Sequence, residues 1–291
     1  MIWHTSRSLE DAIDDRYFAD FATARHGDRA FGSLGSALQK AEIRARFDTL
    51  VGSDPLLRVD DLVAGYGART VLRGVDLRAG AGQMVCLIGP GGAGKSTVLH
   101  SIFGLTDVRS GRIEVGGRNV TRFGPSAKMR EAGIAYVLQD SSVFPDMTVE
   151  RNLWLSGRLI GQYNDSQRAA ERMFERYPAL ARRRDKPASS LCCGERRLLE
   201  LARAFVMRPR LLLVDEPTMG LEAEFVEQIF EMLRDLRDDE GLAILMVEQN
   251  ARWALSVADV GCVVVGGEIA RVGTSGDLLA DPAVGQLFLG D

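Results

Sequence analysis

A glycine-rich segment followed by a lysine and a hydroxyl residue is the clearest chemical signal in this sequence. Residues 89–96 fit the pattern G-x-x-x-x-G-K-[ST] and lie between an apolar stretch, MVCLIG, and a helical one, KSTVLHSIF. Backbone amides of such a turn can close around phosphates, Lys95 can reach the β and γ oxygens, and the Ser96 hydroxyl can ligate Mg²⁺. The segment predicts a phosphate-binding loop formed by Gly89, Pro90, Gly91, Gly92, Ala93, Gly94, Lys95, Ser96 and Thr97.

Two adjacent acids follow another apolar run. Residues 211–217 read LLLVDEP, so a buried strand would deliver Asp215 and Glu216 to the edge where open α/β sheets bind ligands. Asp215 is predicted to hold the Mg²⁺ shell and Glu216 to accept the proton of an attacking water. Alone, these letters also describe a strand that ends in surface acids, but the phosphate loop disfavours that interpretation. The two motifs together suit a kinase, a GTPase or a RecA-like motor equally well.

The elements that must position these residues show two hydrophobic patterns. Residues 56–66 and 70–77 alternate as half-buried antiparallel strands do, whereas MVCLIG, IAYVLQ, LLLVDE and AILMVEQ are continuous apolar runs typical of strands covered on both faces. A helix is predicted between the last two runs, because apolar residues recur there at steps of three and four: Leu221, Phe225, Val226, Ile229, Phe230, Leu233 and Leu236. The pattern predicts an α/β fold, with a mostly parallel sheet and an antiparallel flap.

The two remaining segments show no strand pattern. Residues between Gln139 and Arg210 predict a helical insertion, one apolar edge of which comprises Ala169, Met173, Phe174 and Tyr177. Residues 1–54 contain clustered acids and glycine breaks, with helices expected at 8–24 and 34–50. We interpret residues 1–54 as an N-terminal extension of unknown role; a start codon placed too far upstream is the alternative.

A third motif discriminates among the nucleotide-binding classes. Residues 191–197, LCCGERR, open an amphipathic helix just before the 211–217 strand. Here the chain resembles the ATP-binding subunits of ABC transporters, whose signature reads Leu-Ser-Gly-Gly-Gln/Glu. The resemblance covers roughly residues 56–290. It implies a P-loop NTPase core with a parallel sheet, an antiparallel β subdomain and a helical signature subdomain at about 142–208, all within a domain at 55–291.

The resemblance also assigns roles to single residues. It implies that ATP and Mg²⁺ are the cofactors and that Tyr66 stacks on adenine. It implies that Gln139 senses the metal or water as well as the permease, so the implied metal ligands are Ser96, Gln139 and Asp215. It implies that the signature meets ATP bound on the opposite subunit through Cys192, Cys193, Gly194 and Glu195. The implied catalytic residues are Lys95, Gln139, Glu216 and Gln249.

Several phrases narrow the resemblance to the second ATP-binding subunit of branched-chain amino acid importers, with urea and amide importers as near relatives. These phrases are MREAGIAYV, VFPDMTVERNL, PRLLLVDEPTMGL, LMVEQNARWAL and DPAVGQLFLGD. In that branch Gln249 occupies the position where most ABC ATPases have a switch histidine. The histidines of this chain cannot fill that position and are interpreted as surface or packing residues: His4, His26 and His100.

The cysteine pair departs most from the family signature. Cys192 replaces a serine and Cys193 a glycine; a thiol is the weaker donor and a Cβ obstructs close approach, so we predict an impaired composite site. A redox switch, a metal site and two substitutions without a role are the alternatives. Gly91 stands where relatives often have Asn, and Glu222 stands near the Asp of the D-loop. ATP binding should survive the glycine at position 91. The glutamate at position 222 could weaken communication between the two ATP sites.

Composition and charge exclude several other classes. The chain has 291 residues, 46% apolar and 26% charged, with 36 basic and 40 acidic residues, so no excess of basic residues suggests a nucleic-acid partner. Four cysteines at irregular positions argue against a disulfide framework and favour a reducing cytosol. No window of roughly 18 apolar residues predicts a membrane span, and residues 1–30 do not resemble a secretion signal.

The resemblance therefore implies an ATP hydrolase that energises import, peripheral on the cytoplasmic face of the inner membrane. Its implied partners are a second ATP-binding subunit, permease subunits docked near Val143, Phe144 and Pro145, and indirectly an extracytoplasmic solute-binding protein. A heterodimer is favoured, because a homodimer would place the cysteine pair in both sites. The alternatives are a low-turnover architectural subunit, a urea or amide importer ATPase, and an ABC ATPase that remodels protein or nucleic acid.

Overall fold

The computed structural model describes residues 29–140, 142–159 and 163–285 and divides the chain into two compact units, 1–45 and 46–291. Helix α2 (Arg29–Val51) contains the predicted helix at 34–50, while the one expected at 8–24 lies outside the described residues. Within the second unit, the end of α2 is anchored, because Phe47 is fully buried and the Gln83 amide donates to the Leu50 carbonyl at 3.0 Å. Among the described residues, no helix combines the length and apolarity needed to span a bilayer.

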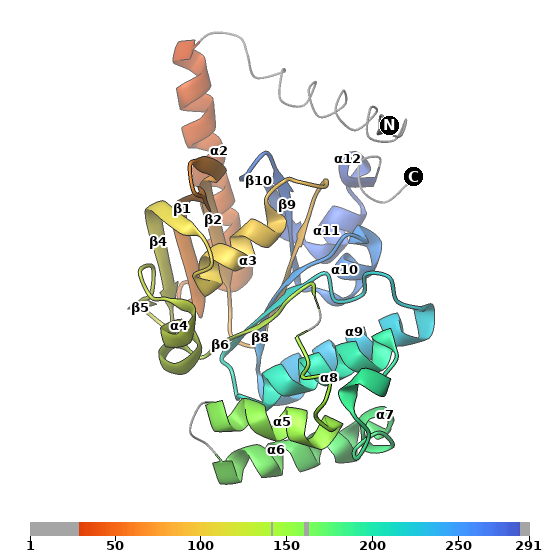
Figure 1. Cartoon of the computed structure of the whole chain (residues 1–291). Helices are drawn as coiled ribbons and strands as arrows, with labels where there is room; N and C mark the ends of the chain where they lie inside the picture. The colour runs from red at the N-terminus through yellow and green to blue at the C-terminus, as the bar shows by residue number, and fades with distance from the viewer. Residues whose placement is uncertain (1–28, 141, 160–162, 286–291) are drawn as a thin grey trace, which may run out of the picture. The chain divides into compact units, whose positions relative to one another are not determined.

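A four-stranded antiparallel sheet forms one layer of the second unit, in the order β2-β1-β4-β5 (Figure 1). Strands β1 (Leu57–Tyr66) and β2 (Arg69–Ala79) are the two alternating segments, and their antiparallel pairing confirms the prediction. Strands β4 (Asp107–Val115) and β5 (Arg118–Asn119) are additional. The sequence does not signal β4, because its first six residues are largely exposed and polar and only its end is buried.

A six-stranded sheet carries the parallel core, in the order β10-β9-β3-β8-β7-β6. The four continuous apolar runs form parallel strands of this sheet, as predicted, with β6 at one edge: β3 (Met84–Ile88), β6 (Ile134–Val137), β7 (Leu211–Asp215) and β8 (Ala243–Val247). Strand β9 (Val260–Val265) joins β3 in parallel, and β10 (Glu268–Thr274) closes the edge in antiparallel. Neither β9 nor β10 is among the predicted strands.

Both faces of this sheet are covered, which explains why its strands are apolar throughout. On one face, Met84, Cys86 and Ile88 join a core with α8 (Cys193–Val206) and α9 (Ala223–Glu240). Val85 and Leu87 point to the opposite face, since side chains alternate along a strand. Helix α3 (Lys95–Phe103) contacts both sheets, and α10 (Ala251–Val257) contacts β3. The predicted stripe of α9 is buried at Val226, Ile229, Phe230, Leu233 and Leu236. Phe225 is partly buried, whereas Leu221 lies before the helix begins and is not part of it.

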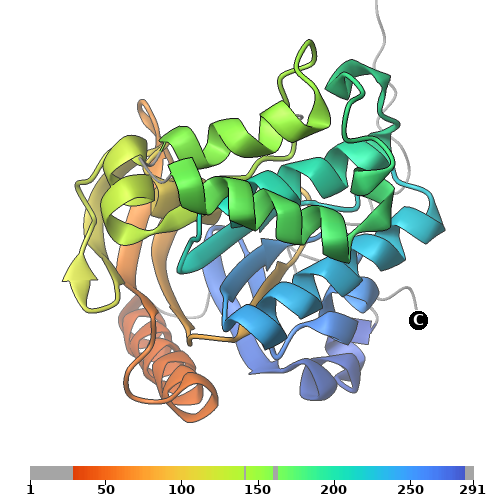
Figure 2. The ribbon, with the colours of Figure 1, turned by 90° about the horizontal axis from the view of Figure 1, so that it is seen from below.

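The described residues between β6 and β7 form helices joined by loops and contain no named strand. This segment comprises α5 (Val149–Leu159), α6 (Tyr163–Arg176), α7 (Pro178–Ala181), a 3₁₀ turn (Ala188–Ser190) and α8, gathered on one side of the sheet (Figure 2). The predicted apolar edge packs inward, with Ala169, Met173 and Phe174 buried and Tyr177 partly buried. Outside this segment lie α4 (Pro125–Ala132), α11 (Ser275–Leu279) and α12 (Pro282–Val284).

A buried lysine on α4 leads to a stability prediction. The Lys128 side chain is fully buried, its Nζ donates to the Ser101 carbonyl at 3.1 Å, and burial lowers its pKa to about 8. Because the folded state disfavours the charged form, the destabilisation is complete below pH 8 and fades as pH rises toward the higher unfolded-state pKa. We expect Lys128→Met to raise the free energy of unfolding at neutral pH by about 1–3 kcal/mol, and by less near pH 10.

Urea denaturation at the two pH values measures this effect. Lys186→Met, at an exposed lysine, serves as the matched control and should change little at either pH. A Lys128→Met protein less stable than the wild type at neutral pH would contradict the prediction.

Candidate active site

The phosphate loop joins β3 to α3 and depends on glycine at its ends. Gly89 has φ 149° and Gly94 has φ 102°, values that favour glycine. A Cβ added to Gly89 would lie 2.2 Å from the Val264 carbonyl oxygen, so no side chain fits there. Gly91 has no heavy atom within 4 Å of an added Cβ, consistent with a variable position of the motif.

Lys95 folds back over this loop. Its Nζ donates to the carbonyl oxygens of Gly89 at 2.7 Å and Pro90 at 2.9 Å. Burial lowers the pKa of Lys95, while the nearby carboxylates of Glu216 and Asp215 oppose that shift. The ammonium group is thus held at the loop by carbonyl groups that phosphate oxygens can replace as partners.

Asp215 sits at the end of β7 between two hydroxyl groups. Ser96 Oγ donates to Asp215 Oδ1 at 3.0 Å, and the Tyr136 hydroxyl donates to Asp215 Oδ2 at 3.0 Å. Burial raises the pKa of Tyr136, which therefore remains a neutral donor. The sequence analysis did not identify Tyr136; its only signal is a polar atom inside the apolar run IAYVLQ.

Glu216 occupies a backbone conformation that non-glycine residues rarely adopt. Its φ is 44°, and the turn is stabilised where its amide donates to the Val247 carbonyl at 2.9 Å. Gln139 Nε2 donates to Glu216 Oε2 at 3.0 Å, so two of the predicted site residues meet directly. Burial, together with the charge of Asp215, raises the pKa of Glu216, which makes the carboxylate a stronger proton acceptor.

An aromatic cluster borders the loop on the side of β1. Tyr66 is 43% exposed, and its hydroxyl lies 2.5 Å from His100 Nδ1. The His100 ring packs edge-on against both Tyr66 and Tyr136, and burial lowers its pKa. His100 thus connects the predicted adenine-stacking residue to the residue that contacts Asp215, a position that sequence reasoning did not identify.

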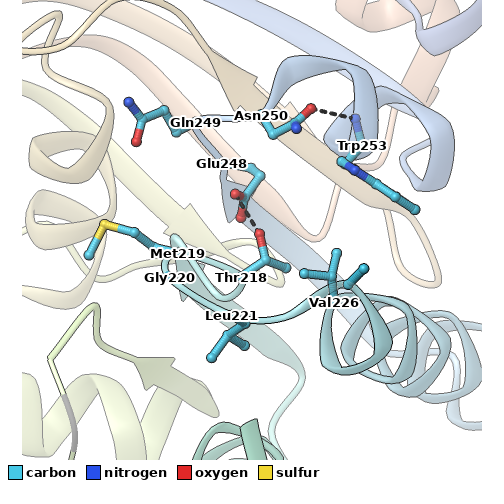
Figure 3. Close-up of a pocket in the computed structure, with 10 residues that line it drawn as sticks. Thr218, Met219, Gly220, Leu221, Val226, Glu248, Gln249, Asn250 and Trp253 are labelled. Carbon is cyan, nitrogen blue, oxygen red and sulfur yellow. Dashed lines mark hydrogen bonds between the residues drawn. The ribbon is translucent and has the colours of Figure 1, made fainter. Parts of the chain in front are cut away.

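A cavity of about 550 Å³ is lined by residues that follow β7 and β8 in the chain (Figure 3). Gln249 is on its wall and points away from the Glu248 carboxyl group. Glu248 is 2% exposed; its Oε1 accepts from the Thr218 hydroxyl at 2.8 Å, whereas its Oε2 has no hydrogen-bond partner. Burial raises the pKa of Glu248, so a second perturbed carboxyl group borders the site.

The cysteine pair stands at the start of α8. Cys192 is the N-cap: its Sγ accepts from the Glu195 amide at 3.4 Å, and its own amide donates to Glu195 Oε2 at 3.1 Å. Both Cys192 and Cys193 have exposed side chains. A Cβ added to Gly194 would lie 2.0 Å from the Phe225 ring, so this position requires glycine. In the part of the chain that the structure describes, no group of three or more His, Cys, Asp or Glu residues is arranged to hold a metal ion.

Comparison with known proteins agrees with this geometry. A sequence profile described as ABC transporter matches residues 72–219, which include the phosphate loop, the signature and both acids. The chain belongs to the ABC transporter ATP-binding family. As an ABC ATPase it binds ATP and is an ATP hydrolase.

Named relatives of this ABC ATPase act in more than one kind of transport. It is 36% identical over 81% of its length to the probable branched-chain amino acid transport protein LivF of Archaeoglobus fulgidus and to BraG of Pseudomonas aeruginosa, covering 99% and 100% of them. It is 32% identical over 81% of its length to the lipopolysaccharide export protein LptB of Acidithiobacillus ferridurans, covering 97% of it. Among solved structures, the ADP conformation of the cassette MJ1267 matches 82% of this chain and all of its own, with TM-score 0.71 and 25% identity.

Proposed function

We propose that this ABC ATPase hydrolyses Mg²⁺-bound ATP to energise a permease that imports branched-chain or other amino acids. The observation that carries the catalytic part is the contact of Gln139 with Glu216, next to an Asp215 already bonded to Ser96. The likeness to LivF and BraG supports the transported class. Because the related LptB is named for lipopolysaccharide export, experiment must establish the direction of transport and the solute.

The oxygen atoms at the loop fit a magnesium ion. Ser96 Oγ and Asp215 Oδ1 are 3.0 Å apart, and both are the hard ligands that Mg²⁺ prefers. When bound, Mg²⁺ would neutralise charge on the phosphate oxygens. Ser96, Asp215 and Gln139 would hold it, Lys95 would pair with the β and γ oxygens, and Tyr66 would stack on the base.

Glu216 would act as the general base. Its raised pKa suits proton transfer from water, and the Gln139 amide orients its carboxylate. Gln249 would substitute imperfectly for the switch histidine, because an amide can donate a hydrogen bond but cannot carry a proton between groups at neutral pH.

Each site would be completed by the signature of another subunit. We favour a non-identical ATP-binding partner, which leaves one composite site without the Cys192–Cys193 pair. The permease would dock near Phe144 and Met147, which are 40% and 36% exposed. A cavity of about 290 Å³ opens beside Met147 and is also lined by Arg151, Trp154, Leu155 and Arg158. The assembled ATPase would lie on the cytoplasmic face of the membrane.

Reconstitution of the native complex tests the proposal. We expect leucine or another amino acid, presented with its solute-binding protein, to stimulate ATP hydrolysis and to accumulate inside proteoliposomes that carry ATP at the nucleotide-binding side. Stimulation by a lipid or by urea, with no response to amino acids, would replace the amino acid proposal.

Restoring the signature tests the predicted impairment. Cys192→Ser together with Cys193→Gly should raise turnover of the assembled complex by about threefold to tenfold, because a hydroxyl donor and an unobstructed backbone approach the partner's γ-phosphate. Phosphate release measures the effect. Cys262→Ser, at a buried thiol of β9, is the control for loss of a cysteine. Equal ATPase activity of the wild-type complex and the complex with the restored signature would refute the impairment.

A low-turnover architectural subunit is the second candidate, favoured by Gln249 and the cysteine pair. The intact Glu216 and its contact with Gln139 oppose it. In that case the partner's site would account for nearly all hydrolysis.

A further inference from the structure

Helix α8 binds the loop that carries Gln139. The guanidinium group of Arg197 donates from Nη1 to the Leu138 carbonyl and from Nη2 to the Gln139 carbonyl, both at 2.7 Å. The planar guanidinium thus fixes two successive peptide groups, which a lysine ammonium cannot do in the same geometry. These bonds lie directly beside the amide that contacts Glu216.

The same arginine is locked in place by a buried acid. Arg197 Nη1 also donates to Glu200 Oε2 at 2.8 Å, with 11% of the Arg197 side chain and 2% of the Glu200 side chain exposed. Glu200 Oε1 accepts from the Ser142 amide at 2.8 Å. Arg203, one turn further along, donates to the Ser142 carbonyl and stacks over the Phe144 ring at 5.1 Å.

Both sides of the Gln139 loop are therefore attached to one helix. That helix begins at the signature, since Cys192 is its N-cap, and Arg197 follows five residues later. At a rise of about 1.5 Å per residue, the signature end and the attachment are separated by only about 7.5 Å of α-helix. A rigid segment of this length moves as a unit.

We propose that Arg197 and Glu200 are positioning residues that couple the two ATP sites of the assembled transporter. The inference rests on the proposed function, in which the signature engages the nucleotide of the partner. A shift of α8 on that nucleotide moves the Leu138 and Gln139 carbonyls through Arg197. It thereby makes or breaks the contact between Gln139 and Glu216 in the chain's own site. Occupancy of one site thus sets the geometry of the other.

Arg197→Lys tests the coupling in the full complex, because it keeps the charge for Glu200 but loses the paired carbonyl bonds. We expect wild type to show a Hill coefficient above one for ATP. In the variant we expect that coefficient to approach one and kcat to fall about tenfold, with half-saturating ATP changed less than about twofold. Arg176→Lys is the matched control, because Arg176 pairs with Asp235 and Asp239 on α9 at an accessible site.

A double variant separates coupling from folding. Arg197→Met with Glu200→Leu removes both members of the buried pair and leaves Arg203 bonded to the Ser142 carbonyl, so its melting temperature should fall less than that of Arg197→Met alone while cooperativity is lost. A cooperative Arg197→Lys enzyme with unchanged kcat would overturn the coupling, as would a wild-type Hill coefficient of one. A loss of kcat that follows melting temperature across the variants, with cooperativity kept, would assign Arg197 to folding alone. A wild-type complex without ATP hydrolysis would refute the proposed function and the coupling together.

Discussion

Glu216→Gln is expected to lower ATP hydrolysis by the assembled complex about 100-fold to 1,000-fold, with ATP affinity changed less than about threefold. The amide has the shape of the carboxylate but cannot accept a proton from water. The contact with Gln139 can persist through the side-chain oxygen. Single-site phosphate release and equilibrium nucleotide binding separate the two effects.

Glu227→Gln is the matched control for this substitution. Glu227 is an exposed carboxylate on the outer face of α9, away from the predicted site residues, and the variant should retain wild-type turnover. Undiminished hydrolysis in the Glu216→Gln complex would contradict the assignment and place the productive site on the partner, as the low-turnover candidate requires.

Lys95→Ala is expected to weaken ATP binding by about 10-fold to 100-fold or more, because charge-assisted bonds to two phosphate groups are lost together. Titration calorimetry with magnesium present measures this on the isolated chain. The unliganded fold should be as stable as wild type, because the substitution removes a buried cation whose hydrogen-bond partners are loop carbonyls.

Gly91→Ala is the control for the loop. Gly91 is not left-handed, and an added Cβ meets no heavy atom within 4 Å, so its affinity should equal that of wild type. Equal ATP affinity in Lys95→Ala and wild type would exclude the loop as the phosphate site.

The sequence predicts those parts of the fold whose pattern is local. The parallel strands follow from continuous apolar runs, because both of their faces are buried. The stripe of α9 follows from apolar residues at helical spacing, because one face of that helix is buried. Strand β4 escapes prediction because pairing with β1, not hydrophobicity, stabilises its exposed half. The edge strand β10 is likewise defined by its partner β9.

The candidate site divides in the same way. Lys95, Ser96, Asp215 and Glu216 belong to contiguous motifs, so their types and spacing are visible in the sequence. Other residues of the site can be identified only in the structure, because each forms hydrogen bonds with residues distant in the chain: Tyr136 with Asp215, His100 with Tyr66, and Arg197 with Leu138 and Gln139. Roles of that kind depend on tertiary placement and leave no local pattern.

The close approach of Gly194 to Phe225 restricts where the signature can vary. Helices α8 and α9 meet there without room for one methyl group, whereas the two preceding side chains project outward. Substitutions at 192 and 193 therefore change the exposed start of α8, where Cys192 also caps the helix, and leave the packing between α8 and α9 intact. Under the proposed function, such changes would lower ATP hydrolysis at the nucleotide held by the partner without opening a cavity in the core of this chain.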